Sequence, residues 1–167
     1  MGVQSLNIRL ARDTDFEAIW PILRAVIRAG ETYAIDPRIS REGAFDLWMN
    51  APRATYVVEA GGEVLGTYYI KTNQPGGGAH VCNCGYMVAE AARGQGLAAQ
   101  MCEHSQAEAL KLGYRAMQYN LVLATNTHAI HLWHKLGFDT VGRLPMAFDH
   151  PKMGLIDALV MYKWLAF

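Results

Sequence analysis

The feature of the sequence that most constrains the fold is a strand–turn–helix–strand pattern between residues 80 and 124. A strand-like segment (80–89) leads into the turn ARGQGLAA, which contains two glycines, and a run of helical character (94–112) follows. A second strand-like run, AMQYNLVLA, begins at Ala116. This order of elements predicts a β-α-β unit.

Further helices and strands are predicted on both sides of this unit. The end signals are Gly30 after the first helix, and Ser40 before and Pro52 after the second. The Gly61-Gly62 pair predicts a hairpin turn. The elements expected are a strand at 6–12, helices at 15–29, 40–49 and 126–136, the hairpin strands ATYVVEA and EVLGTYYIKT, and the late strands FDTVGRL and IDALVMYKW.

Length and composition limit the domain organisation and the partners. The 167 residues contain no repeat and no second core, so one domain over residues 1–167 is expected. Lys+Arg and Asp+Glu are both 15, and this neutral chain offers no basic field for nucleic acid or an anionic membrane. No run approaches the roughly 20 apolar residues of a bilayer span, and the start lacks a signal-peptide pattern. We therefore expect a cytoplasmic protein.

The three cysteines give no metal or disulfide signal. Cys82, Cys84 and Cys102 are an odd number outside any disulfide framework, and their spacing supplies no four-ligand zinc set. The histidines add no third ligand to the pair at positions 131 and 134. Structural cysteines and no bound metal are expected.

A glycine turn before a helix is typical of an anion site, because unpaired N–H groups and the helix dipole face the ligand. The run GQGLAA (94–99) matches the dinucleotide fingerprint G-x-G-x-x-G/A. However, the acidic residue expected about 20 positions later is missing, and the turn does not follow the first strand of the chain. A P-loop needs a Lys-Ser/Thr pair where Leu97-Ala98 stands. Both nucleotide interpretations are therefore disfavoured.

The order of elements and two motifs resemble the GCN5-related N-acetyltransferase (GNAT) family. The family's cofactor motif, Gln/Arg-x-x-Gly-x-Gly/Ala, is matched by Arg93, Gly96 and Ala98. Its second signature is Asn, then Ala, then Leu-Tyr-x-x-x-Gly-Phe, and this signature is matched in part by Asn126, Ala129, Leu132, Gly137 and Phe138. The resemblance covers essentially the whole chain. It implies an α/β (α+β) fold, with a mixed, mostly antiparallel sheet of six to seven strands, a central splayed strand pair and about four flanking helices.

The resemblance implies that acetyl-CoA binds at the turn, where small residues let a pyrophosphate approach the backbone amides. Arg93 either adds a charge-assisted contact or is only an exposed arginine at a helix start. Asn126 either bonds to the pantetheine arm or caps the short helix, and both roles can hold together. The strand backbone around Met87 and Val88 is expected to pair with the same arm. The cofactor-binding candidates are Met87, Val88, Arg93, Gly94, Gln95, Gly96, Leu97, Ala98, Asn126 and Trp133.

The implied reaction is direct acetyl transfer from the thioester to an amine in a ternary complex, with the oxyanion held by a backbone amide of the splayed strand. The sequence departs from the family where Leu132-Trp133 replaces Leu-Tyr. An indole N–H does not usefully titrate, so Trp133 cannot act as the usual general acid. It either contacts the cofactor or only packs. Turnover without this acid is feasible, because thiols ionise near a pKa of about 8.5.

A narrower resemblance, to the azetidine-2-carboxylate acetyltransferase subgroup, points to two asparagines. It is carried by Asn83, Asn120 and Asn126 together with GETYAIDP and LPMAFDHPKMGLIDALVMYK. Members of that subgroup acetylate proline analogues, and asparagines on their two central strands position the substrate and the thioester. Asparagine is disfavoured within strands, so Asn83 and Asn120 need a polar reason. They are the catalytic candidates, and the alternative is that both bond only to neighbouring backbone.

The acceptor candidates follow from the same resemblance, which places the acceptor pocket between the early-helix connection and the late strands. They are Glu31, Tyr33 and His150, and either Glu31 or His150 could deprotonate the ammonium. The expected function is acetyl-CoA-dependent N-acetylation of a small-molecule amine, such as an amino acid or proline analogue. The family's pairing through late strands or exposed edges is compatible with a homodimer. The alternative is a non-catalytic acyl-CoA-binding or sensing module.

Overall fold

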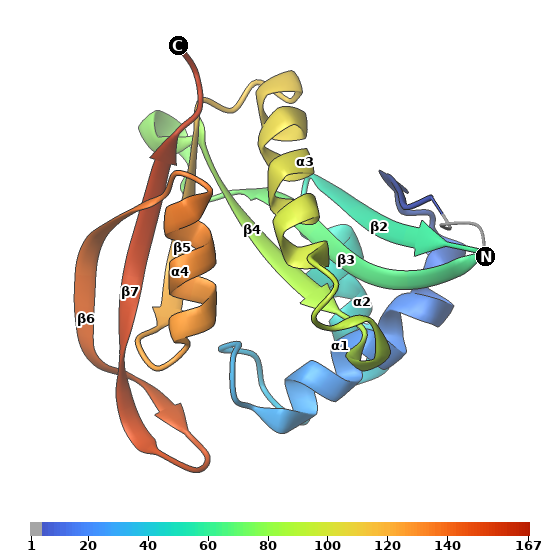
Figure 1. The fold of residues 1–167 in the computed structure, drawn as a ribbon, viewed down its shortest axis with the longest axis horizontal. Helices are drawn as coiled ribbons and strands as arrows, with labels where there is room; N and C mark the ends of the chain where they lie inside the picture. Colours follow the sequence, from blue (N-terminus) through green and yellow to red (C-terminus); the bar gives the residue numbers. More distant parts are fainter. Residues whose placement is uncertain (1–4) are drawn as a thin grey trace.

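The computed structural model describes residues 5–167 as one twisted sheet with helices on both faces (Figure 1). The strands are β1 (Asn7–Leu10), β2 (Ala54–Ala60), β3 (Glu63–Thr72), β4 (Val81–Val88), β5 (Ala116–Leu123), β6 (Asp139–His150) and β7 (Gly154–Trp164). The helices are α1 (Phe16–Ala29), α2 (Arg41–Phe45), α3 (Leu97–Lys111) and α4 (Thr127–Lys135), and a π-helical turn, Asp46–Asn50, continues α2. None of the helices within residues 5–167 combines the length and the apolar character that crossing a membrane requires.

The seven strands lie in the order β1-β2-β3-β4-β5-β7-β6. Neighbouring strands are antiparallel except β4 and β5, which are parallel and are connected through α3. The predicted fold class is therefore confirmed, including the β-α-β unit. The predicted hairpin between β2 and β3 is confirmed as well, since Gly61 and Gly62 both take the positive φ of a tight turn (58° and 82°).

The predicted helix ends are confirmed by their capping geometry. Gly30 ends α1 in the left-handed conformation, with φ at 65°, and its N–H donates to the carbonyl of Ile27. The Ser40 hydroxyl accepts the N–H of Gly43 (3.0 Å) at the start of α2. Pro21 lies inside α1, which continues past it.

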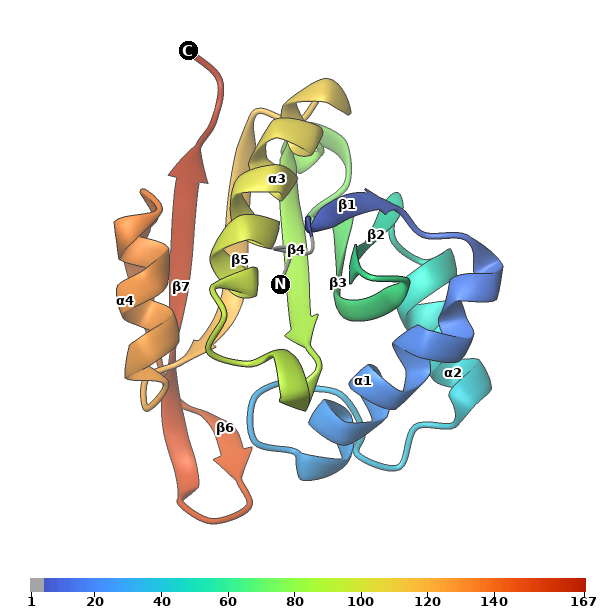
Figure 2. The same cartoon turned by 45° about the vertical axis from the view of Figure 1, so that its right-hand side comes forward.

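Helices cover both faces of the sheet (Figure 2), and each face carries one large apolar cluster. A third, smaller cluster of buried residues consists of Leu123, Phe148 and Ala158. On one face α1, α2 and the π-helical turn bury side chains that recur at helical spacing, including Phe16, Leu23 and Trp48. On the other face α3 and α4 cover the sheet through residues such as Met101 and Trp133. A ligand that crosses the plane of the sheet can therefore do so only where two strands separate.

That separation occurs between β4 and β5. The two strands pair only at Val81–Ala116 and Cys82–Met117, and beyond these pairs they diverge (Figure 1). The Asn83 side chain lies at the point of divergence, where its Nδ2 donates to the carbonyl of Gln118 on β5 (2.9 Å). A side chain thus replaces the next rung of the backbone ladder. The splayed strand pair expected from the family resemblance is present.

The late strands extend further than the sequence predicts. The run FDTVGRL predicts a strand that ends at Leu144, but β6 continues to His150 and pairs with β7 on both sides of an interruption between Leu144 and Phe148. Pro145, the next residue, cannot donate a ladder hydrogen bond. The structure accommodates it in a bulge between Leu144 and Phe148, where Met146 takes a positive φ (48°) and donates its N–H to Asp157 (2.9 Å).

Candidate functional site

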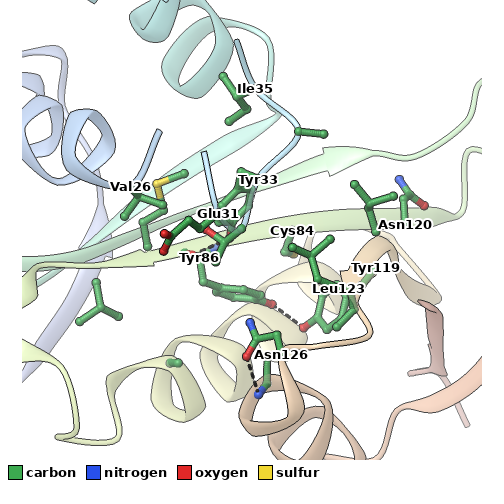
Figure 3. A pocket seen from close by; sticks show the side chains of 18 of the residues that line it. Val26, Glu31, Tyr33, Ile35, Cys84, Tyr86, Tyr119, Asn120, Leu123 and Asn126 are labelled. Carbon is green, nitrogen blue, oxygen red and sulfur yellow. Dashed lines mark hydrogen bonds between the residues drawn. The ribbon is translucent and has the colours of Figure 1, made fainter. Parts of the chain in front are cut away.

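A cavity of about 750 Å³ lies in the gap between β4 and β5 (Figure 3). It is bounded by the two strands, the start of α3, the first turn of α4 and the segment 31–35 that follows α1. Among the predicted site residues it brings together Glu31, Tyr33, Asn83, Met87, Val88, Arg93, Ala98, Asn120, Asn126 and Trp133. Gly94, Gln95, Gly96, Leu97 and His150 do not line it.

The glycine turn before α3 is shaped by backbone conformation. Gly94 and Gly96 have φ values of 77° and 75°, a region that residues with a side chain rarely adopt. A Cβ added to either residue would meet no atom within 4 Å, so the turn faces open space. Leu97 is buried in the core and anchors the start of α3, whose first N–H groups have no acceptor within the helix. These amides are therefore available to an anion.

The backbone of Tyr86 faces the gap between β4 and β5. The Tyr33 hydroxyl donates to the Tyr86 carbonyl (2.6 Å) and accepts the Tyr86 N–H (2.9 Å). Successive residues of a strand direct their backbone groups to opposite sides. Since the Ala89 N–H donates to the Leu65 carbonyl on β3, the backbone groups of Met87 also face β3, whereas those of Tyr86 and Val88 face the gap. The backbone groups of Tyr86 and Val88 thus face the gap, and those of Tyr86 are bonded to the Tyr33 hydroxyl.

An aromatic cluster lies on the α3 and α4 side of the gap. The Trp133 ring packs with its centroid 5.5 Å from that of Tyr86 and 5.0 Å from that of Tyr119. The two tyrosine hydroxyls share a hydrogen bond of 2.9 Å, and Tyr86 also bonds to Ser105 (2.7 Å). Burial raises the pKa of both phenols well above the usual range, so they stay protonated near neutral pH.

Sequence reasoning did not single out Tyr86 and Tyr119. Both lie within apolar segments predicted to be strands, where aromatic residues usually belong to the core. Their positions in the sequence could have indicated a role at the site, because Tyr86 precedes the glycine turn and Tyr119 adjoins Asn120. Only the pairing of β4 and β5 reveals that the two side chains meet.

Amide side chains form a chain of hydrogen bonds on the α1 side of the gap. Asn83 is buried, donates to the Gln118 carbonyl (2.9 Å) and accepts from the Tyr69 hydroxyl (3.3 Å). Asn120 is exposed, accepts from the Gln118 side chain (2.9 Å) and donates to Asn73 (2.7 Å). Asn83 thus bonds to neighbouring backbone, as the alternative interpretation expected of both asparagines, whereas the side chain of Asn120 bonds to other side chains. The two predicted asparagines lie in one network beside the cavity.

The acceptor candidates lie in different environments. Glu31 forms an ion pair of 2.7 Å with Lys152 from the β6–β7 turn, and this contact lowers the pKa of its carboxyl. Desolvation raises the pKa of the Tyr33 phenol to about 12. His150 is buried outside the cavity lining, where its Nδ1 accepts the N–H groups of Lys152 (3.1 Å) and Met153 (3.2 Å). The structure therefore brings Glu31 and Tyr33 to the cavity and places His150 at the end of β6, beside the β6–β7 turn.

Asn126 connects the cavity with α4. Its side-chain oxygen accepts the N–H of Ala129 (3.2 Å), so it caps the helix (Figure 3). It also lines the cavity. Within residues 5–167 no group of three or more His, Cys, Asp or Glu side chains could hold a metal ion, and the three cysteines are buried and free.

The sheet order, the splayed pair and the turn before α3 define the fold of the GCN5-related N-acetyltransferases. The sequence model of the acetyltransferase (GNAT) family matches residues 16–138, so the chain belongs to this family. The structure of a GCN5-related N-acetyltransferase from Kribbella flavida is 43% identical, covers 96% of this chain and 98% of its own, and superposes with a TM-score of 0.90.

One further relative and one further solved structure are similar to this chain. The N-acetyltransferase aca1 of Schizosaccharomyces pombe is 32% identical over 132 residues, which is 70% of this chain and 63% of that protein. The chain thus matches less than two thirds of that relative's length. The structure of yncA, a putative acetyltransferase from Salmonella typhimurium with its cofactor acetyl-CoA, has the same fold, with a TM-score of 0.84. Its sequence is 21% identical, and the match covers 98% of this chain and 95% of that chain.

Proposed function

We propose that this chain is an acetyl-CoA-dependent N-acetyltransferase that acetylates the amine of a small molecule, an amino acid or a proline analogue. One observation carries the proposal: a single cavity runs from the start of α3, through the gap between β4 and β5, to Asn83 and Asn120. A donor from one face and an acceptor from the other can therefore meet at β4. The yncA structure, which has this fold, contains acetyl-CoA.

The donor side offers groups that fit the pyrophosphate and the pantetheine arm of acetyl-CoA, which supplies the acetyl thioester. The amides of residues 94–98 and the Arg93 guanidinium suit a pyrophosphate. The backbone of Tyr86 and Val88 suits an amide-bearing arm, and the bonds of the Tyr33 hydroxyl to both Tyr86 backbone groups support this assignment. Asn126 and the Trp133 ring complete the wall on the α4 side.

The transfer step depends on the groups at the centre of the gap. We assign the Tyr86 N–H to the carbonyl oxygen of the thioester, where it stabilises developing negative charge. Asn83 and Asn120 orient the amine from the α1 side. Trp133 packs at the position where the family has its general acid. Because an indole cannot supply a proton, CoA leaves as a thiolate when the C–S bond breaks.

The ammonium loses one proton before the attack and a second as the amide forms, and both leave on the acceptor side. Glu31 is the candidate base that lines the cavity, and its lowered pKa makes it a weak one. His150 could contribute only after a change at the β6–β7 turn, because its Nδ1 is bonded to two backbone N–H groups. The cavity volume of about 750 Å³ is shared by both substrates, which favours a small acceptor over a peptide.

The proposal is tested by a thiol-release assay with acetyl-CoA and a panel of amino acids, proline analogues, polyamines and aminoglycosides. We expect release of CoA that depends on one class of small amine, together with the acetylated product by mass spectrometry. Tight acetyl-CoA binding without release for any acceptor would instead favour the non-catalytic acyl-CoA-binding module.

A further inference from the structure

Lys71 lies on β3 at the edge of the cavity, on the side of the sheet that faces α1. It is paired in register with Asn83 on β4, so the two side chains share one face. Lys71 is half-buried and lines the cavity, as do Asn83 and Asn120. It therefore belongs to the acceptor side, although neither the motifs nor the family resemblance pointed to it.

The ammonium of Lys71 lies over the ring of Tyr69, two residues earlier on the same strand. Its Nζ lies 5.3 Å from the ring centroid of Tyr69. That ring lies directly on β4 at Gly85, where a Cβ would come within 2.7 Å of the Tyr69 ring. Gly85 precedes Tyr86, whose N–H faces the gap. The ammonium is thus held close to the part of β4 at which the acetyl group would be transferred.

Lys71 also differs from the other charged residues of the cavity. Glu31 is neutralised by Lys152, and Arg93 lies at the opposite end, beside the glycine turn. In the described part of the chain, Lys71 forms no ion pair with a carboxylate. A half-buried cation without a counter-ion is a favourable partner for an anionic group of a ligand.

We propose that Lys71 binds the carboxylate of the acceptor and so selects amino acids over amines that lack a carboxylate. The inference rests on the proposed function and adds a specificity-determining residue to it. In an amino acid the amine and the carboxylate are separated by one carbon atom. A carboxylate held by Lys71 therefore fixes the direction of the amine toward the gap, where Asn83 and Asn120 lie.

The test compares matched pairs of acceptors. Each amino acid of the panel is paired with the amine that lacks only its carboxylate, for example azetidine-2-carboxylate with azetidine. Thiol release gives kcat and KM, and calorimetry in the presence of CoA gives acceptor affinity without turnover. The variants are Lys71→Gln, the conservative Lys71→Arg, and Lys135→Gln as a control on an exposed lysine of α4 outside the cavity.

We expect the unaltered chain to bind and acetylate the acid in preference to the paired amine. Lys71→Gln should raise KM and Kd for the acid about 10- to 100-fold, the range of a charge-assisted contact, and leave those for the amine unchanged. Lys71→Arg should restore part of the preference, and Lys135→Gln should have no effect. The affinity for acetyl-CoA should stay the same in all three variants.

Three results would overturn the inference. The first is that the unaltered chain binds acid and amine equally well, or binds neither member of any pair. The second is that Lys71→Gln weakens both members of a pair to the same extent, which indicates a structural role for Lys71. The third is that Lys71→Gln leaves the preference intact. Thiol release with amines but without preference would refute this inference alone, whereas binding without any release would refute the proposed function.

Discussion

At the scale of single residues, the two predicted catalytic asparagines have different tasks. Asn83 is buried and joins β4 to β5 through its bond to the Gln118 carbonyl, so it maintains the start of the gap. Asn120 is exposed and is held only by side chains of Asn73 and Gln118. A ligand can therefore exchange partners with Asn120 more easily than with Asn83. The sequence indicated both asparagines equally, because it carries no information about which one bridges the strands.

This difference predicts separable effects of two substitutions. Asn83→Ala should lower the free energy of unfolding by about 1–2 kcal/mol, because the partners of a buried amide are left unsatisfied. Asn120→Ala should change it by less than about 0.5 kcal/mol but lower kcat about tenfold or more, with acetyl-CoA affinity retained. Chemical unfolding and steady-state kinetics measure these quantities.

Asn50→Ala is the matched control, since Asn50 is an exposed asparagine outside the cavity that bonds to Asp46. It should change neither kcat nor affinity. An equally small effect of Asn120→Ala and Asn50→Ala on kcat would remove Asn120 from the reaction.

At the scale of elements, local signals predicted the cofactor side well. Glycines at helix and hairpin ends have conformational requirements that show directly in the sequence, which is why the turn before α3 was found. The segment after α1 was harder to interpret, because its role depends on Tyr33 reaching Tyr86 across 53 positions of the sequence. The bulge at Met146 was not predicted, because its position depends on the pairing of β6 with β7.

The turn before α3 gives a prediction at this scale. Gly96→Val should raise Kd for acetyl-CoA about tenfold, because a branched residue at a φ of 75° costs about 1–2 kcal/mol and displaces the start of α3. Isothermal titration calorimetry measures the affinity. Gly77→Val is the control, since Gly77 lies in an exposed 3-10 turn (Gly76–Gly78), has no positive φ, and a Cβ there meets nothing within 4 Å. Equal affinities of the two variants would show that the turn does not hold the cofactor.

At the scale of the whole molecule, the gap between β4 and β5 connects the two faces of the sheet. The gap was expected from the family resemblance alone. No local run of residues shows that two strands 35 positions apart in the sequence diverge in space. The sequence therefore predicted the donor and acceptor candidates but not their common cavity. It also did not predict that Glu31 and Tyr33 would close one side, the first by its ion pair with Lys152 and the second by its bonds to Tyr86.

The central claim is that the gap between β4 and β5 is the donor site, and a crystal structure with acetyl-CoA tests it most directly. We predict that the pantetheine arm lies along β4 and bonds to the backbone of Tyr86 and Val88. In that complex the Tyr86 N–H should donate to the thioester carbonyl and no longer to the Tyr33 hydroxyl. Acetyl-CoA bound outside the gap, with Tyr33 still bonded to the Tyr86 N–H, would contradict the account.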